Sequence, residues 1–245
     1  MAITTKYKNS PLIETICEFH YIHKEQWDAT LPGMLYESVK EEYPVKNQRK
    51  DFYQPPGMID EGLNNLTVFT QFYNEKKESL IQIGKNVLTI NCLKPYPHWE
   101  FFKPMILKNS GIYREIAKPI SLRQLSLRYI NKINIPINDG EKVSLKEYFK
   151  YYPNRPEELK GDMSSIDIVI HLPHNEDRDA LILRLATVLP DEEKQVSFLL
   201  QLDFIMVKPE QLPLDNLEEW LENAHSIINS TFELSITDKC KALFN

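Results

Sequence analysis

The sequence is poor in glycine and cysteine and has no long apolar run. Only seven of its 245 residues are glycine, which leaves few positions for loops that bind phosphate groups. The three cysteines, Cys17, Cys92 and Cys240, lie far apart, so we expect free thiols in a reducing compartment, the cytoplasm. Because no uncharged apolar stretch approaches the roughly 18 residues of a membrane span, we expect neither a membrane segment nor an export signal.

An excess of positive charge is also missing. The chain has 29 Lys+Arg and 35 Asp+Glu residues, a net charge of −6, so it offers no general attraction for nucleic acid. Residues 1–140 contain 18 basic and 15 acidic residues (+3), and residues 141–245 contain 11 and 20 (−9). These opposite charges favour contact between the two parts, or between two copies, over a polyanionic partner.

Motifs for catalysis and cofactor binding are likewise absent. The sequence contains no HExxH, paired CxxC, GxSxG, Walker A or GxGxxG pattern. It therefore predicts no cofactor and no metal site. An enzyme is the less favoured class, although catalytic residues can be dispersed along a chain.

What the sequence does contain is a series of periodic segments. A period of two, typical of half-buried strands, runs through residues 13–22 and 122–135. Strands are also expected at residues 66–73, 80–83, 87–93, 166–172, 180–189 and 196–207. A helical period runs through residues 31–43, 99–116 and 217–228. Pro104 and the Ser110-Gly111 pair predict a kink or a break in the second of these helices.

Capping residues predict two further helices. Ser144, with Glu147 three residues later, precedes LKEYFKYY and has the pattern of a capping box. Thr237 precedes DKCKALF and predicts a short terminal turn. A helix is therefore expected in each place.

Short connections between the strands indicate antiparallel pairing. Residues 80–83 and 87–93 are joined by Gly84-Lys85-Asn86, a hairpin connection. The sequence therefore predicts an α+β protein with mainly antiparallel sheet and helices packed on one face. Two arrangements stay open: residues 1–140 and 141–245 form two similar α+β halves side by side, or they form one continuous domain.

Polar side chains recur on one face of several predicted strands. If these faces meet in one sheet, groups such as Arg128, Arg184 and Asp203 converge on a surface that suits a peptide or a small polar ligand. The alternative is a sheet face stabilised by cross-strand pairs, such as Arg128 with Asp203.

Residues 45–65 show no period and predict a long irregular loop around Pro55-Pro56-Gly57. Arg49, Lys50 and Tyr53 combine charge with an aromatic ring, a mixture that can bind single-stranded nucleic acid. Acidic residues nearby dilute that charge, so a solvated loop is the simpler interpretation and nucleic acid is not the expected partner.

Short motifs resemble those of a known family. The segments NSPLIE at 9–14, ICEF at 16–19 and LRYIN at 127–131 are similar to the N-terminal and central motifs of a sporadically distributed bacterial family of unknown function. Its patchy distribution implies mobile genetic elements, and hence defence or toxin–antitoxin neighbourhoods. The resemblance directs attention to five candidate residues of a polar sheet face, whose alternative role is structural pairing: Glu14, Glu18, Arg128, Asn131 and Asp203.

Two functions follow as hypotheses. The first is a cytoplasmic, non-enzymatic binding or accessory protein, defence-associated or antitoxin- or immunity-like. Its partner is another protein or a second copy, with a small polar ligand as a further option. The second is a metal-dependent hydrolase or nuclease that uses dispersed side chains, namely Asp167, His171, His174 and Asp203.

Overall fold

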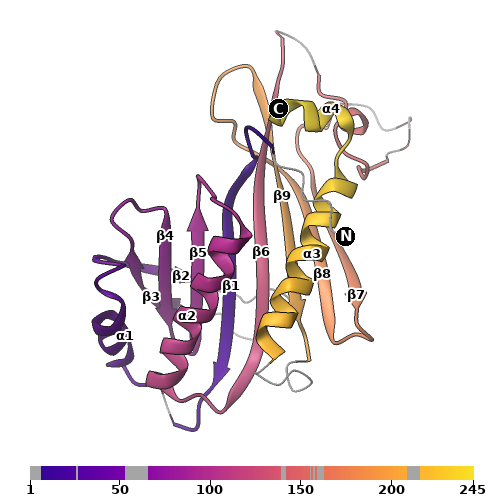
Figure 1. Ribbon diagram of the computed structural model, residues 1–245. Helices are drawn as coiled ribbons and strands as arrows, with labels where there is room; N and C mark the ends of the chain where they lie inside the picture. Colours follow the sequence, from indigo (N-terminus) through magenta and orange to yellow (C-terminus); the bar gives the residue numbers. More distant parts are fainter. Residues whose placement is uncertain are drawn as a thin grey trace.

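The computed structural model describes residues 7–25, 27–52, 66–138, 142–154, 156, 158, 163–208 and 216–245. In these parts of the chain, nine strands form one antiparallel sheet in the order β2-β3-β4-β5-β1-β6-β9-β8-β7 (Figure 1). The strands are β1 Leu12–Ile22, β2 Val45–Phe52, β3 Leu66–Tyr73, β4 Ser79–Gly84, β5 Val87–Leu93, β6 Ser121–Pro136, β7 Asp167–His174, β8 Asp179–Val188 and β9 Gln195–Met206. The predicted α+β class with a mainly antiparallel sheet is confirmed.

Four helices accompany the sheet in the described residues. They are α1 Leu31–Val39, α2 Trp99–Ala117, α3 Leu217–Ser235 and α4 Asp238–Lys241, with 3₁₀ turns at Leu145–Glu147 and Ala242–Phe244. Among the helices described, none combines the length and the apolar composition needed to cross a membrane.

The parts of the chain before and after residue 140 are joined by the pairing of the two longest strands, β6 and β9. β6 pairs along its length with β1 on one side and with β9 on the other. Residues from both parts therefore contribute to one continuous sheet.

One face of the sheet carries the hydrophobic core. On β1 the alternate side chains of Cys17, Phe19 and Tyr21 are buried, as a period of two predicts. α2 contacts β5, α3 contacts β6 and β9, and both helices lie in front of the sheet in Figure 1. Phe102 of α2 and Leu221 of α3 are fully buried in this core. Burial of such a side chain stabilises the fold by about 1.5–3 kcal/mol.

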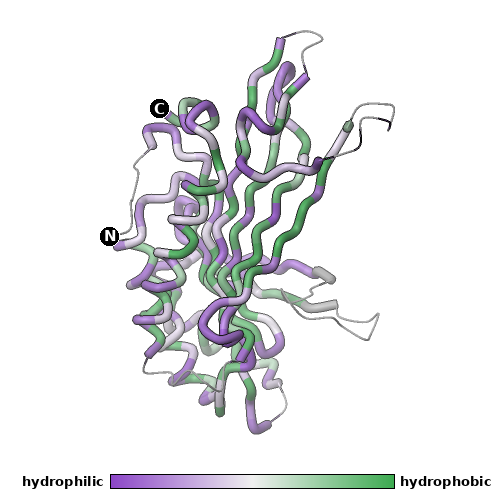
Figure 2. Tube along the Cα trace, turned by 90° about the vertical axis from the view of Figure 1, so that its right-hand side faces the viewer, coloured by the Kyte–Doolittle hydropathy of each residue, from purple (hydrophilic) through white to green (hydrophobic). Residues whose placement is uncertain are grey.

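The far end of the sheet bends away from these helices. In the side view of Figure 2, α2 and α3 lie to the left of the sheet, and β2 and β3 project to the right. The face opposite α2 and α3 is therefore bordered on one side by the β2–β3 pair.

Three predicted elements differ in the structure. Residues 45–52 form the edge strand β2 and not a loop; their period is hidden because Lys46 to Lys50 are all exposed. LKEYFKYY forms only a 3₁₀ turn, and Ser144 makes no capping bond, because Phe149 is instead buried in an extended bridge to Ile236. α2 is a single helix that runs through Pro104, so the expected break into two short helices is absent.

Two local predictions are confirmed. β4 and β5 are joined by a tight hairpin in which Asn86 has φ of 62°, a left-handed conformation that asparagine tolerates. The Thr237 side chain accepts a hydrogen bond from the Cys240 amide at 3.3 Å and so caps α4.

His225 of α3 is packed between α2 and the sheet. Its ring stacks on Trp99 at 4.2 Å between centroids, Nδ1 lies 2.7 Å from the Tyr129 hydroxyl, and Nε2 lies 3.0 Å from the Asn229 amide. Burial lowers the pKa of His225 to about 4, although Glu222 and Glu100 favour the charged form. The imidazole is therefore neutral in the folded protein near neutral pH.

This burial predicts a loss of stability in acid. Below pH 6.5 the unfolded chain protonates His225 and the folded protein does not, so the free energy of unfolding falls until the folded pKa of about 4. From pH 7 to pH 4.5 we expect His225 to contribute a loss of about 2–3 kcal/mol. Urea denaturation should therefore show a weaker pH dependence for His225→Gln than for the wild type. His98→Gln, at an exposed histidine, should retain the wild-type slope; an unchanged slope in His225→Gln would contradict the assignment.

Candidate functional site

The face of the sheet opposite the core is lined by polar side chains. Neighbouring residues of a strand point to opposite faces of the sheet. The face that does not carry Cys17 and Phe19 of β1 therefore carries Glu14, Glu18 and His20. We call this surface the polar face. Its main members on eight strands are Gln71, Gln82, Thr89, Asn91, Glu14, Glu18, His20, Gln124, Ser126, Arg128, Gln201, Asp203, Arg184 and Asp167.

A directed row of hydrogen bonds crosses β2, β3, β4, β5 and β1 on this face. The Asn47 amide donates to Gln71 at 2.9 Å, and Gln71 donates to Gln82 at 2.7 Å. Gln82 donates to Asn91 at 3.1 Å, and Asn91 donates to the Glu14 carboxylate at 2.7 Å. Each amide thus fixes the orientation of the next, and the row ends on a charge acceptor, which strengthens such chains.

Burial is the largest influence on the pKa of Glu14, the residue at the end of this row. Its pKa is raised by burial, against the opposing effects of the Asn91 hydrogen bond and the charges of Arg128 and Arg49. Beside it, His20 Nε2 lies 2.8 Å from the Glu18 carboxylate. The centre of the polar face therefore holds two carboxylates with fixed partners.

Arg128 and Asp203 form the expected cross-strand pair. They are directly opposite each other in the β6–β9 register, and Arg128 Nε donates to Asp203. Gln201 Nε2 donates to the other carboxylate oxygen at 2.8 Å. Asp203 is only 3% exposed, and burial raises its pKa against the opposing influence of Arg128 and Gln201. The pair is a costly group to bury unless both partners are present.

A second pair lies nearer the sheet edge. Arg184 of β8 donates two hydrogen bonds to Asp167 of β7, at 2.9 and 2.7 Å. Both side chains are about half exposed, and the hydrogen bonds from Arg184 lower the pKa of Asp167. A pair this exposed adds little to stability, so its fixed geometry is available for recognition.

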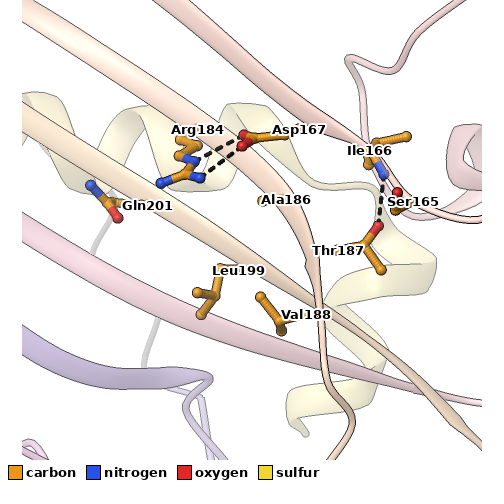
Figure 3. A pocket seen from close by; sticks show the side chains of 9 residues that line it. All are labelled: Ser165, Ile166, Asp167, Arg184, Ala186, Thr187, Val188, Leu199 and Gln201. Carbon is orange, nitrogen blue, oxygen red and sulfur yellow. Dashed lines mark hydrogen bonds and ion pairs between the residues drawn. The ribbon is translucent and has the colours of Figure 1, made fainter.

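A hollow lies on the polar face at the ends of β7, β8 and β9 (Figure 3). One cavity of about 350 Å³ is lined by Asp167, Arg184 and Gln201 together with the apolar Val188 and Leu199. A neighbouring depression of about 640 Å³, wide open to solvent, shares Thr187, Val188 and Leu199. We call the two together the β8–β9 groove, whose second part is completed by Ile13, Lys132 and Leu189.

Four of the five residues singled out by the resemblance lie on the polar face, namely Glu14, Glu18, Arg128 and Asp203. Asn131 does not. It has the same strand parity as Tyr129, and its amide donates to the Leu200 carbonyl at 3.1 Å on the buried side. Its placement there corrects the expectation of a polar-face residue.

The predicted loop residues lie elsewhere. Arg49 and Lys50 belong to the edge strand β2, and Tyr53 lies outside the described residues. The Arg49 guanidinium sits 5.6 Å from the centre of the Phe69 ring. The sequence patterns did not predict this row of amide side chains. The available signal was a single amide side chain, Gln71, Gln82 or Asn91, within each of three mainly apolar strands.

The side chains proposed for a metal-dependent reaction are divided between the two faces. Asp167, His171 and Asp203 lie on the polar face. His174 lies on the other, with its ring centroid 5.5 Å from that of Phe204. Among the residues that the structure describes, no three His, Cys, Asp or Glu side chains are grouped closely enough to hold a metal ion.

Comparison with known proteins adds little. No family model and no curated protein matches the chain. Among solved structures, the Pct1 RNA triphosphatase of S. pombe aligns over 99% of this chain and 84% of that chain, with 8% sequence identity and a TM-score of 0.15. A similarity that low carries no argument about fold or function.

Proposed function

We propose that this protein is a binding protein and not a catalyst, and that it holds a segment of a partner protein in the β8–β9 groove. The observation that carries the proposal is an apolar floor bordered at two ends by charged side chains that are already paired. An accessory or immunity-like role, the class suggested by the sequence resemblance, requires such a surface.

The floor of the groove offers apolar contact to a partner. Val188 and Leu199 line both cavities, and Leu189 at the end of β8 is 87% exposed. A single exposed leucine is common on protein surfaces, but one that adjoins an apolar hollow resembles the centre of a protein interface.

The rim of the groove supplies orientation. The Arg184–Asp167 pair borders one end, and Lys132, paired with Asp191, borders the other. Because each cation already has a carboxylate partner, the rim carries no net charge. This balance supports a polar peptide segment as the ligand over a polyanion, and side chains held in place before binding lower the entropic cost of association.

The buried part of the polar face supports this groove. Gln201 lines the groove and is held by Asp203, which is held in turn by Arg128. We infer a positioning role for this pair, because Asp203 itself is too buried to contact a partner.

We also infer the finer architecture that the binding role requires. The helices would cover one face of the sheet and leave the β8–β9 groove on the other face for the partner, as the contacts of α2 with β5 and of α3 with β6 and β9 support. The strand order supports two similar halves: β1 pairs with β5 and β6 pairs with β9, and β5 and β9 are each followed by a long helix, α2 and α3.

Selection from a displayed library of random linear peptides tests the binding role. We expect wild-type protein to enrich peptides with an apolar anchor, and Leu189→Asp to weaken their binding at least about tenfold. Leu234→Asp, at a leucine of α3 that is also exposed, is the matched control and should bind like the wild type. Failure to enrich any peptide, or equal binding by Leu189→Asp, would overturn the proposal.

A further inference from the structure

The two outer strands of the sheet differ in how they are protected. At one edge, β2 exposes Lys46, Arg49 and Lys50, and such charges discourage a second strand from pairing. At the other edge, β7 reads DIVIHLPH and carries no Lys or Arg. The β7 edge thus lacks the charges that protect β2.

The backbone of β7 has hydrogen-bonding groups that point outward. The Thr187 amide of β8 donates to the Ile166 carbonyl at 2.9 Å, so residue 166 faces β8. Since antiparallel strands alternate in this respect, the N–H and C=O groups of Asp167, Val169 and His171 face away from β8. β7 is the last strand of the sheet in the described residues, so these groups lie along an open edge.

The side chains of this segment are self-complementary about Val169. Ile168 precedes it and Ile170 follows it, both on the side of the sheet that carries the core. Asp167 and His171 stand two positions away on the polar face. The Asp167 carboxylate is a hydrogen-bond acceptor, and a ring N–H of His171 can donate to it. A second copy run antiparallel about Val169 therefore meets like with like on the apolar side and opposites on the polar side.

We propose that two copies of this chain pair through β7, antiparallel and about a two-fold axis at Val169, so that one sheet continues through both subunits. Asp167 then lies opposite the partner's His171, and Ile168 lies opposite the partner's Ile170. The outward N–H and C=O groups of Asp167, Val169 and His171 pair with those of the same three residues in the partner, which is the isologous contact that two-fold symmetry requires.

The neighbouring register fits less well. An axis at Ile170 places Asp167 opposite the partner's Pro173, which has no N–H to donate. It also brings Val169 opposite the partner's His171 and so separates the acid from the imidazole. Backbone bonding and charge complementarity both select the axis at Val169.

This dimer does not rest on the proposed peptide groove, but it affects it. Asp167 lines the groove through its pair with Arg184. The partner's His171 therefore arrives beside the groove of each subunit, and the two grooves flank the seam.

Val169→Lys is the decisive variant. Val169 is 50% exposed, so a lysine at this position has room to extend into solvent, away from Arg184 on the neighbouring strand, but it faces the partner's Lys at the axis. Sedimentation equilibrium should show the wild type as a dimer of twice 28.8 kDa and Val169→Lys with a dissociation constant raised at least about tenfold. Val207→Lys, at a valine equally exposed, should dimerise like the wild type. A wild type that stays monomeric at its highest soluble concentration, or equal behaviour of the two variants, overturns the proposal.

Cysteine crosslinking tests the register. Val169→Cys places two thiols opposite each other at about 5.5 Å between Cα atoms, within the span of a disulfide. Leu172→Cys, also at an exposed site, places them about 20 Å apart, six residues along the strand. The native cysteines are buried and free and give little background. Oxidation should link Val169→Cys alone; equal linkage of both variants rejects this register and with it the proposal.

Discussion

Replacement of Arg128 by methionine is expected to lower the free energy of unfolding by about 3–5 kcal/mol. Methionine keeps much of the apolar stem but removes the charge that compensates Asp203. Asp203 is 3% exposed, and its other carboxylate oxygen accepts a hydrogen bond from the neutral amide of Gln201. A carboxylate left in that position is either ionised without a cation or protonated at a cost in free energy.

The direction of the pH effect distinguishes this cause from lost packing. Burial already raises the pKa of Asp203 in the folded protein, and loss of Arg128 raises it further. The folded state then favours the protonated acid, so the deficit of Arg128→Met relative to the wild type should shrink as pH falls. A second substitution, Asp203→Asn, should recover most of the loss at neutral pH.

Arg184→Met is the matched control for this experiment. Arg184 forms a similar pair with Asp167, but both side chains are about half exposed, and a screened pair of that kind is worth less than about 1 kcal/mol. Urea denaturation of the two variants gives the comparison. Equal and small losses would mean that burial of Asp203 has little energetic consequence.

Replacement of Asp179 by alanine is expected to cost about 3 kcal/mol or more. Asp179 begins β8 and is 0% exposed. Its carboxylate accepts hydrogen bonds from Trp220 Nε1 at 3.1 Å, from Asn175 Nδ2 at 2.6 Å and from Arg178 at 3.1 and 2.6 Å. Removal of the acceptor leaves several donors, including a buried indole N–H, without it.

The Asp179 carboxylate also holds the β7–β8 turn to α3. Asn175, Glu176 and Asp177 all have positive φ, at 50°, 55° and 62°, a conformation that Asn and Asp tolerate but that is unfavourable for Glu176. Without Asp179 we expect this turn to loosen, with faster amide hydrogen exchange at the adjoining end of β7. Asp191→Ala, at an exposed aspartate paired with Lys132, should remain close to the wild type in both measurements. Similar losses in both variants would contradict the special role of Asp179.

Sequence patterns identified most of the strands because their apolar side chains gather on the face that packs in the core. The alternation of Cys17, Phe19 and Tyr21 with polar residues, and the long alternation through β6, are direct consequences of a two-residue repeat beside a core. β2 was not predicted because this edge strand is exposed along Lys46–Lys50 and has no alternating apolar residues to detect.

The sequence predicted which residues belong to the candidate site better than it predicted how they are arranged. Alternation along the strands places Glu14 and Glu18 on the same face of the sheet. It places Asn131 on the core side with Tyr129, although the motif LRYIN had grouped Asn131 with Arg128. Which strands are neighbours is not written in local patterns, since pairing depends on contacts distant in sequence. The pairing of β6 with both β1 and β9 brings Arg128 beside Asp203, 75 residues later in the chain.

The sequence by itself thus determined the absence of common catalytic motifs, the alternating strands, the helices at α2 and α3 and the separation of charge between the two parts of the chain. These properties depend on composition and on spacing within single segments. Only the tertiary structure decided which polar residues meet, which edge of the sheet is left open and where the groove lies. The physical reason is that a strand's period fixes the face on which a side chain lies, whereas its neighbours are set by the packing and pairing of the whole sheet.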